Sequence, residues 1–264
     1  MTKRTAITNT KGGAGKSSTT VNLAIAAVKK NLKVLVVDFD PQGSTTLSCG
    51  LYERRDLDLN LFGSHRIIME KEIGPTQLAI PCHYGFDVIP STSELLNADD
   101  HIRRTPMGDS MLLRAFNDDL DLSKYDLILF DTQGAPSSLL SSVINAADDI
   151  IIPAVASKDC MPSIETVLGI VGSLNSFRSA YGIDEISLRG HFFNNAEKTV
   201  LHRECESVMK ERLGALHLTL FNVDATTKIK ACLSEGLSIF DVYPNHKAVE
   251  QYTALFNRLY KDLV

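Results

Sequence analysis

The amino-acid sequence predicts a doubly wound α/β fold, in which a mainly parallel β-sheet is flanked by helices on both faces. Short β-branched runs alternate with segments of helical periodicity along the 264 residues. Most of these runs are apolar at successive positions, as expected for strands that helices cover on both sides. The alternation and the apolar runs together favour parallel strands joined by helical crossovers.

The individual elements follow from these patterns. The expected strands lie at 4–9, 33–38, 86–90, 126–131, 149–154, 187–193 and 216–221. A helix is expected over 17–30, and its shared apolar face consists of Val21, Ala24, Ile25 and Val28. Because this segment is apolar nearly all round, we expect the helix to run through the interior.

Length and composition predict one domain over residues 1–264. Hydrophobic residues make up 44% and charged residues 22%, as in an ordinary globular protein. The sequence shows no internal repeat and no flexible linker, and we interpret the irregular region 50–85 as a surface excursion. The first expected strand begins at residue 4, so no N-terminal helix-turn-helix domain is expected.

Charge and cysteine content narrow the class of protein further. The net charge of −5 excludes binding of nucleic acid by bulk attraction, so such binding needs a local basic patch. The five cysteines lie far apart without a C-x-x-C pair, which disfavours a disulfide framework or a metal cluster. No secretory leader is visible, and no apolar run approaches the ~18 residues of a membrane span. We therefore expect a cytoplasmic protein.

The most informative motif follows the first strand, where residues 10–18 read TKGGAGKSS. A glycine-rich turn between a strand and a helix directs successive backbone N–H groups at phosphate oxygens, and the helix N-terminus adds the positive end of its dipole. Lys16 is expected to reach the β- and γ-phosphates, and the Ser17 hydroxyl to bind Mg²⁺. The predicted nucleotide-binding residues of this loop are Gly12, Gly13, Ala14, Gly15, Lys16, Ser17 and Ser18.

This loop departs from the general phosphate-loop pattern G-x-x-x-x-G-K-[ST] at two positions. Thr10 stands where the pattern has glycine, and Lys11 is a second lysine for which the pattern has no role. A plain glycine-rich turn is the alternative interpretation. The position of G-K-S directly after a strand favours a phosphate loop.

Two aspartates end the second expected strand, in the stretch VLVVDFDPQGS. Asp38 and Asp40 are two residues apart, so we expect both to point to one face at the carboxyl edge of the sheet, beside the phosphate loop. Two carboxylates beside a triphosphate are unfavourable unless a cation separates them, which predicts a metal ion and a water held for attack. Pro41 and Gly43 predict a loop that changes shape. A solvated turn is the alternative.

A third motif, YDLILFDTQGAP, is a hydrophobic strand that ends in Asp131. This is the form of a Walker B element, whose aspartate holds Mg²⁺ directly or through water. Taken alone, the stretch favours a strand that simply ends in an aspartate turn. Its place after the other two motifs favours the metal-binding interpretation.

In this order, KGGAGKS, DFDPQG and FDTQGAP resemble the motifs of the ParA/MinD family of deviant Walker-A ATPases. The resemblance covers essentially the whole chain and continues through residues 88–99, 147–159 and 234–252. It implies the deviant Walker-A P-loop NTPase fold and the cofactors ATP and Mg²⁺. The implied activity is a slow hydrolysis of ATP to ADP and phosphate that a partner protein stimulates.

The resemblance also implies roles for individual residues. Lys11 would be the family's signature lysine, which reaches across a nucleotide-sandwich homodimer to the phosphates bound by the partner subunit. The implied catalytic residues are Lys11, Lys16 and Asp40, with Asp40 positioning the attacking water. The implied Mg²⁺ ligands are Ser17, Asp40 and Asp131. The family often has D-T-P-P after the Walker B strand, whereas this chain has DTQGAP.

By resemblance, ParA-like members bind DNA non-specifically as ATP dimers, and a ParB-like or other adaptor stimulates hydrolysis. This predicts a nucleoid-associated ATPase that positions a plasmid, a chromosome or another cargo. The implied DNA contacts are Lys198, Arg203, Lys228 and Lys230, with Arg189 as a further candidate. Ordinary solvated charges are the alternative for each of them. Asn194 and the loop after Phe221 are candidates for adenine contacts.

Each of three alternative functions requires a particular feature of the sequence. A MinD-like membrane-cycling ATPase needs a basic amphipathic C-terminal helix. Here the apolar stripe Val249, Tyr252, Phe256, Leu259 and Leu263 faces mixed charges, so we expect a core-packing helix and no membrane binding. An iron–sulfur ATPase needs cysteines just after the Walker B strand, but the nearest is Cys160. A metabolic synthetase or kinase needs a substrate pocket, which the sequence does not identify.

Overall fold

The computed structural model describes residues 2–213 and 222–263, and its central element is an eight-stranded sheet of order β3-β4-β2-β5-β1-β6-β7-β8. All neighbouring strands are parallel except β3 and β4. The described strands are β1 (Lys3–Ile7), β2 (Val34–Phe39), β3 (Ile80–Pro81), β4 (Asp87–Ile89), β5 (Leu127–Thr132), β6 (Asp149–Ala154), β7 (Ser187–Ala196) and β8 (Asn222–Asp224). The predicted fold class is confirmed.

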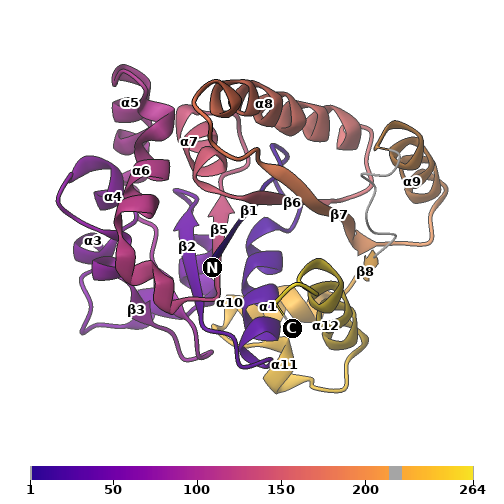
Figure 1. Cartoon of the computed structure of the whole chain (residues 1–264). Coiled ribbons are helices and arrows are strands. Elements are labelled where there is room, and N and C mark those ends of the chain that lie inside the picture. The colour runs from indigo at the N-terminus through magenta and orange to yellow at the C-terminus, as the bar shows by residue number, and fades with distance from the viewer. Residues whose placement is uncertain (1, 214–221, 264) are drawn as a thin grey trace.

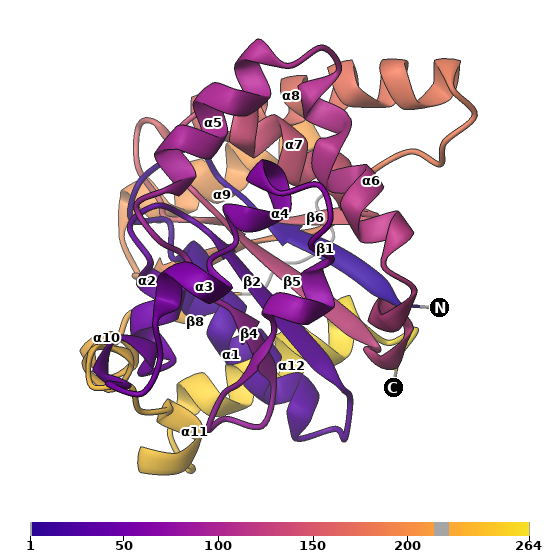
Figure 2. The same cartoon turned by 90° about the vertical axis from the view of Figure 1, so that its left-hand side faces the viewer.

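Helices cover the sheet on both faces (Figures 1 and 2). Helices α5, α6, α7 and α8 lie on one side, and α1 and α12 lie on the other. The described helices are α1 (Lys16–Val28), α2 (Ser44–Ser48), α3 (Leu59–Phe62), α4 (Arg66–Met69), α5 (Leu95–Arg104), α6 (Met111–Asp118), α7 (Ser138–Ala146), α8 (Cys160–Ala180), α9 (Val200–Leu213), α10 (Thr227–Ser234), α11 (Ile239–Val242) and α12 (Lys247–Leu259).

Successive residues of the central strands enter two different hydrophobic clusters. Ile128 and Phe130 of β5 pack in the cluster beneath α5–α8, whereas Leu127 and Leu129 pack in the cluster on the side of α1 and α12. Side chains alternate across a strand, so a strand that is apolar at every position supplies both layers. Every residue of α1 from 19 to 27 is buried, which confirms the predicted interior helix.

Most strand predictions agree with the structure, and the differences have local causes. The strand expected at 149–154 coincides with β6, while the one expected at 4–9 ends at Ile7 because the phosphate loop begins there. No pattern in the sequence indicated the two-residue β3, β8 or the extension of β7 to Ala196. The strand expected at 216–221 lies outside the described residues. Region 50–85 is only partly a surface excursion, since Ile67 and Leu78 belong to the core.

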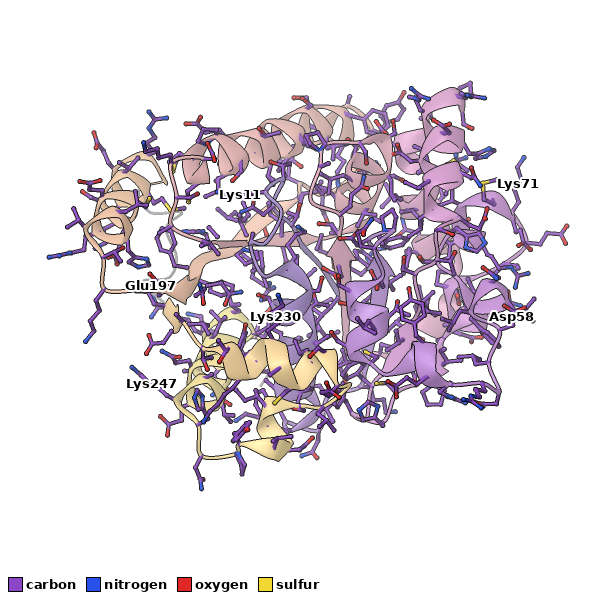
Figure 3. All side chains as sticks on the ribbon, turned by 180° about the vertical axis from the view of Figure 1, so that it is seen from behind. Lys11, Asp58, Lys71, Glu197, Lys230 and Lys247 are labelled. Atoms are coloured by element: carbon purple, nitrogen blue, oxygen red, sulfur yellow. The ribbon has the colours of Figure 1, made fainter. Side chains whose placement is uncertain are left out.

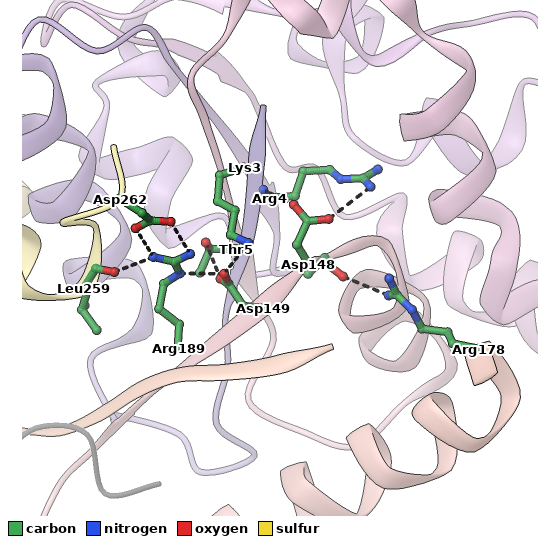
Figure 4. Close-up of polar contacts among 10 residues, drawn as sticks. Lys3, Arg4, Thr5, Asp148, Asp149, Arg178, Arg189, Leu259 and Asp262 are labelled. Atoms are coloured by element: carbon green, nitrogen blue, oxygen red, sulfur yellow. Dashed lines mark hydrogen bonds and ion pairs between the residues drawn. The ribbon is translucent and has the colours of Figure 1, made fainter. Parts of the chain in front are cut away.

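A charged network at the amino edge of the sheet fastens the C-terminal helix (Figure 4). The fully buried carboxylate of Asp149 accepts hydrogen bonds of 2.6 Å from Thr5 Oγ1 and from Arg189 Nε, and it pairs with Lys3 Nζ at 3.2 Å. Arg189 also donates to the Leu259 carbonyl and to Asp262. The network therefore joins three strands to the end of α12.

The same network overturns one sequence prediction. Arg189 was a candidate for DNA contact, but its side chain is 11% exposed and its guanidinium is held by Asp149 and Asp262. Two carboxylates at this distance neutralise the guanidinium charge, so its attraction for a DNA phosphate is weak. The prediction for Arg189 is therefore wrong.

Helix α12 packs in the core, as its apolar stripe predicts. Tyr252, Phe256 and Leu259 are buried, and the partly buried Val249 and Leu263 pack against the same cluster as α1. In the part of the chain that the structure describes, no helix is long and apolar enough to cross a membrane. The apolar face of α12 is therefore already covered by the protein itself.

Arg189→Ala is expected to lower the free energy of unfolding by about 3 kcal/mol. The reason is that the buried Asp149 carboxylate loses its guanidinium partner and keeps only Lys3 and Thr5. Urea unfolding followed by circular dichroism measures this change. Arg103→Ala is the control, since that side chain is 62% exposed in a surface pair and its loss should leave stability unchanged. Equal stabilities of all three proteins would contradict the role of the network.

Candidate nucleotide-binding site

The predicted phosphate loop lies between β1 and α1 at the carboxyl edge of the sheet. Gly13 and Gly15 have φ values of 75° and 84°, in the left-handed region that favours glycine. Gly12 and Gly13 are exposed, so their backbone faces solvent. Asn9 shapes the turn, because its Oδ1 accepts from the Lys11 N–H at 2.8 Å and its Nδ2 donates to the Pro153 carbonyl at 2.8 Å. The turn is therefore a preformed anion-binding loop.

Asn194, at the end of β7, supports this loop from below. Its Nδ2 donates to the Gly15 carbonyl at 3.3 Å and to Thr19 Oγ1 at 3.1 Å, while Tyr252 donates to its Oδ1 at 3.3 Å. A Cβ atom at Gly15 would lie 2.1 Å from Asn194 Nδ2, so only glycine fits there. Both the nitrogen and the oxygen of the Asn194 amide are therefore used in contacts that hold the start of α1. The adenine contact expected of Asn194 stays a prediction.

Lys16, the first residue of α1, is only 7% exposed and lies within the field of two carboxylates. Burial lowers the pKa of its ammonium group, and the charges of Asp131 and Asp40 oppose that shift. The loop after β5 also comes close, since a Cβ atom at Gly134 would lie 3.1 Å from Lys16 Nζ. The structure thus brings the three motifs of the sequence together around one lysine.

Asp131, the penultimate residue of β5, is a fully buried carboxylate with one oxygen that has no hydrogen-bond partner. Its Oδ2 accepts from Thr45 Oγ1 at 2.8 Å, whereas its Oδ1 is buried without a hydrogen-bond partner in the structure. Burial raises the pKa of Asp131 to about 6, although Ser17, Thr45 and Lys16 act in the opposite direction. A buried oxygen with no donor, beside a serine hydroxyl, is the donor set that suits Mg²⁺.

No self-contained metal centre is present among residues 2–213 and 222–263, since they include no group of three or more His, Cys, Asp or Glu placed to hold an ion. Mg²⁺ bound with a nucleotide usually takes only one or two carboxylates and completes its shell with phosphate oxygens and water. The residues here fit an ion that arrives with a nucleotide.

Asp38 and Asp40, which the sequence predicts to lie on one face, differ in burial and in hydrogen-bond partners. Asp38 is fully buried, where its Oδ2 accepts from the Thr46 N–H at 2.8 Å and from Thr46 Oγ1 at 2.7 Å. Asp40 is partly exposed, and its Oδ1 accepts from the Gln42 N–H at 3.0 Å. Strand β2 ends at Phe39, so the alternation on which the prediction rested does not extend to Asp40. The charge of Asp40, like that of Asp131, acts on Lys16.

The Asp38 carboxylate positions its neighbour instead. Its Oδ1 accepts from the Asp40 N–H at 3.1 Å, and Ser91 Oγ donates to the Asp40 carbonyl at 2.5 Å. Burial, followed by the charge of Asp131, raises the pKa of Asp38 to about 8. The backbone of Asp40 is therefore held on both sides while its side chain remains accessible.

Lys11 contacts the loop between β6 and α8. Its Nζ donates to Ser157 Oγ and pairs with Asp159 at 3.7 Å, and its side chain is 27% exposed. Figure 3 shows it beneath α8. Lys11 and Lys16 thus leave the same loop toward different surroundings. The role of Lys11 across a dimer stays a prediction.

The four remaining DNA candidates are exposed and form two groups. Lys198 and Arg203 line a cavity of about 440 Å³ that also includes Glu197 and Asp224, so its charge is mixed. Lys228 and Lys230 belong to α10 (Figure 3 labels Lys230). Their DNA contacts stay predictions.

The five cysteines, all of which lie in the described ranges, are free thiols. Cys160 is buried at the start of α8, and burial raises its pKa to about 12. A cluster ligand must be a thiolate that the cluster can reach. The site therefore offers no support for the iron–sulfur alternative.

Sequence reasoning missed the hydroxyl groups that hold the site in place. Thr45 and Thr46 follow the aspartate motif directly, and Ser91 lies in the stretch VIPSTSELLNAD. Their positions were visible, but no spacing rule pairs a particular hydroxyl with a particular carboxylate. Ser157 and Asp159, the partners of Lys11, lie 146 and 148 residues along the chain from it and gave no signal.

Comparison with known proteins identifies the family. A family model described as an AAA domain matches residues 2–179. The chromosome-partitioning ATPase Soj of Thermus thermophilus is 28% identical over 213 residues, which cover 80% of this chain and 77% of that protein. An uncharacterized protein of Pseudomonas putida is 32% identical over 58% of this chain and 56% of its own length. The chain belongs to the ParA/MinD family of P-loop ATPases.

Solved structures share the fold at low sequence identity. An ATP complex of a variant of McdA from Cyanothece has a TM-score of 0.81 at 22% identity, covering 98% of this chain and 96% of its own. Cobyrinic acid a,c-diamide synthase from Mycobacterium smegmatis, with an ATP analog and magnesium bound, has a TM-score of 0.76 at 20% identity, covering 97% and 93%. These likenesses show the fold alone.

Asp131→Asn is expected to stabilise the nucleotide-free protein at alkaline pH. A carboxyl group whose pKa is raised by folding contributes stability that is present near pH 4 and lost as pH rises through about 6. Above that pH the variant should exceed the wild type by on the order of 1–3 kcal/mol, and the difference should vanish near pH 4. Urea unfolding across this range in EDTA measures it.

The exposed Asp121→Asn serves as the control for that comparison. Its stability should follow the wild type at every pH. A wild type that stays more stable than Asp131→Asn at alkaline pH would show that the Asp131 charge is well compensated in the empty site, contrary to its unpartnered Oδ1.

Proposed function

We propose that this chain is a ParA-type partition or positioning ATPase, a single ATPase domain over residues 1–264 that binds ATP with Mg²⁺ and hydrolyses ATP to ADP and phosphate. The observation that carries the proposal is the placement of two lysines from one loop. Lys16 lies among Asp131 and Asp40, and Lys11 contacts a different loop with Ser157 and Asp159. The names of curated relatives, which include Soj and ParA, support the same class.

The site residues act on the nucleotide in complementary ways. The exposed N–H groups of Gly12 and Gly13 and the start of α1 bind phosphate oxygens. Lys16 neutralises the β- and γ-phosphates, and its burial strengthens that attraction. Ser17 and Asp131 hold Mg²⁺, with Asp40 as a further ligand. An ion held there would neutralise the charge that develops on the phosphate oxygens.

Asp40 positions the attacking water. Its backbone is fixed by Asp38 and Ser91, while its carboxylate is free to accept a hydrogen bond from water. A carboxylate in this role orients the nucleophile in line with the γ-phosphoryl group. With no stronger base beside it, hydrolysis is slow until an adaptor completes the site.

Lys11 completes the site of a second subunit. In the nucleotide-free chain its ammonium group is held by Ser157 and by Asp159, whose side chain is 83% exposed. An exposed ion pair is weak, so phosphates of a partner subunit compete with it effectively. ATP binding therefore favours a nucleotide-sandwich homodimer, and hydrolysis releases it.

The ATP-bound dimer binds DNA without sequence preference through Lys198, Arg203, Lys228 and Lys230, which places it on the nucleoid. Scattered exposed cations suffice for phosphate contacts, because such contacts need no base readout. A ParB-like or other adaptor stimulates hydrolysis and releases the dimer from DNA. Membrane cycling of the MinD type is disfavoured, because the apolar face of α12 is buried in the core.

Gel-shift binding to arbitrary duplex DNA with ADP, ATP and a slowly hydrolysed ATP analogue tests the function. Binding should need ATP or the analogue and should fall steeply between two salt concentrations. Replacing Lys198, Lys228 and Lys230 by Gln should reduce both the affinity and the salt dependence. Lys71→Gln, far to the right of Lys230 in Figure 3, is the control. Liposome binding in place of DNA binding would overturn the proposal.

Lys11→Ala is expected to bind ATP but to remain monomeric in its presence. Its own site keeps Lys16, whereas the phosphates of the opposite subunit lose a neutralising charge. Equilibrium dialysis with labelled ATP measures binding, and sedimentation velocity measures dimerisation. Lys71→Ala should behave as the wild type. Normal ATP-dependent dimerisation of the Lys11 variant would refute the cross-subunit role.

A further inference from the structure

The short helix α2 holds the two buried carboxylates of the site through successive residues. Thr45 Oγ1 donates to Asp131 Oδ2 at 2.8 Å, and Thr46 donates to Asp38 Oδ2 from both its N–H and its Oγ1. Both threonines are fully buried. One short helix thus reaches two neighbouring strands, β2 and β5.

The carboxylates of Asp38 and Asp131 differ in how many of their oxygens accept a hydrogen bond. Both oxygens of Asp38 accept hydrogen bonds, from Thr46 and from the Asp40 N–H. Asp131 has one oxygen taken by Thr45 and the other without a partner. A carboxylate held by one oxygen only is oriented, with its second oxygen available to a ligand.

We propose that Thr45 is a positioning residue for the metal ion: its hydroxyl fixes the Asp131 carboxylate so that Oδ1 is presented to Mg²⁺. This inference rests on the proposed function for the identity of the ion. Partners that hydrogen-bond a metal-ligating carboxylate fix its orientation, and their loss typically weakens metal binding about 10–100-fold. Thr45 therefore governs the affinity for Mg²⁺ without touching the nucleotide.

The position of α2 also links this carboxylate to the Asp40 loop. The helix begins directly after that loop, where the Gly43 N–H donates to the Asp40 carbonyl at 2.8 Å. Gly43 has φ 61°, and the Leu47 N–H donates to its carbonyl at 2.8 Å. The loop and the helix are therefore one connected unit. A change in the orientation of Asp131 acts on the Asp40 loop through Thr45.

The test is a Mg²⁺ titration of binding of a fluorescent, slowly hydrolysed ATP analogue. In Thr45→Val a methyl group replaces the hydroxyl at nearly constant shape, so the half-saturating Mg²⁺ concentration should rise about tenfold or more. Binding of the analogue in EDTA should equal that of the wild type. Thr45→Ser, which keeps the hydroxyl, should restore the wild-type Mg²⁺ dependence.

Ser48→Ala is the control, because it removes a buried hydroxyl from the same helix, where Ser48 Oγ donates to the Ser44 carbonyl at 2.8 Å and not to a carboxylate of the site. It should lower the thermal midpoint as Thr45→Val does, yet keep the wild-type Mg²⁺ dependence. A purely structural role of α2 would move both variants alike and would overturn the inference. If Thr45→Val does not fold, comparing Thr45→Ala with Thr45→Ser isolates the effect of the same hydroxyl. Equal Mg²⁺ dependence of these two variants would overturn the inference.

The outcomes separate this inference from the function on which it rests. A wild type that binds the analogue in a Mg²⁺-dependent manner, with Thr45→Val and Thr45→Ala unchanged, overturns the role of Thr45 alone. A wild type that binds no analogue with Mg²⁺ present overturns the ATPase proposal as well.

Discussion

Two buried carboxylates on neighbouring strands, Asp38 and Asp131, are the constraint on which the site depends. They are register partners in the β2–β5 ladder, and both are fully buried. Charges in such a position are unfavourable unless hydrogen bonds and cations compensate them. Hydrogen bonds to both oxygens compensate the Asp38 carboxylate. Asp131 has only the hydrogen bond from Thr45 to one oxygen and the nearby charge of Lys16, and its other oxygen has no partner. The buried, unpartnered Oδ1 of Asp131 therefore favours the binding of a cation.

At the amino edge of the sheet, the charge of a buried carboxylate is fully compensated by its neighbours. Asp149 is as deeply buried as Asp131, but it is surrounded by Lys3, Arg189 and Thr5. That network joins the strands to the C-terminal helix. The same residue type thus has complete partners at the amino edge, where it serves stability, and an unpartnered oxygen at the carboxyl edge, where we propose that it binds a ligand.

The sequence predicted the parts of the site that follow from local patterns. The sequence could place the glycine-rich loop and Asp131 at one edge of the sheet because a strand, a glycine turn and a helix impose their own spacing. The prediction of a shared face for Asp38 and Asp40 rested on strand alternation, but strand β2 ends between them, which no periodicity shows. Arg189 was misassigned because its partner Asp262 is 73 residues distant. Tertiary pairing of side chains is invisible to local patterns.

The arrangement also explains why one loop carries two lysines. Lys16 is buried near the Asp131 and Asp40 carboxylates. Lys11 instead contacts Ser157 and pairs with the exposed Asp159, from which we propose that the phosphates of a second subunit draw it. Isothermal titration of ATP with Mg²⁺ into the wild type and into Lys16→Ala tests this account most directly. It predicts one nucleotide per chain for the wild type and none for the variant. Equal binding by both proteins would contradict it.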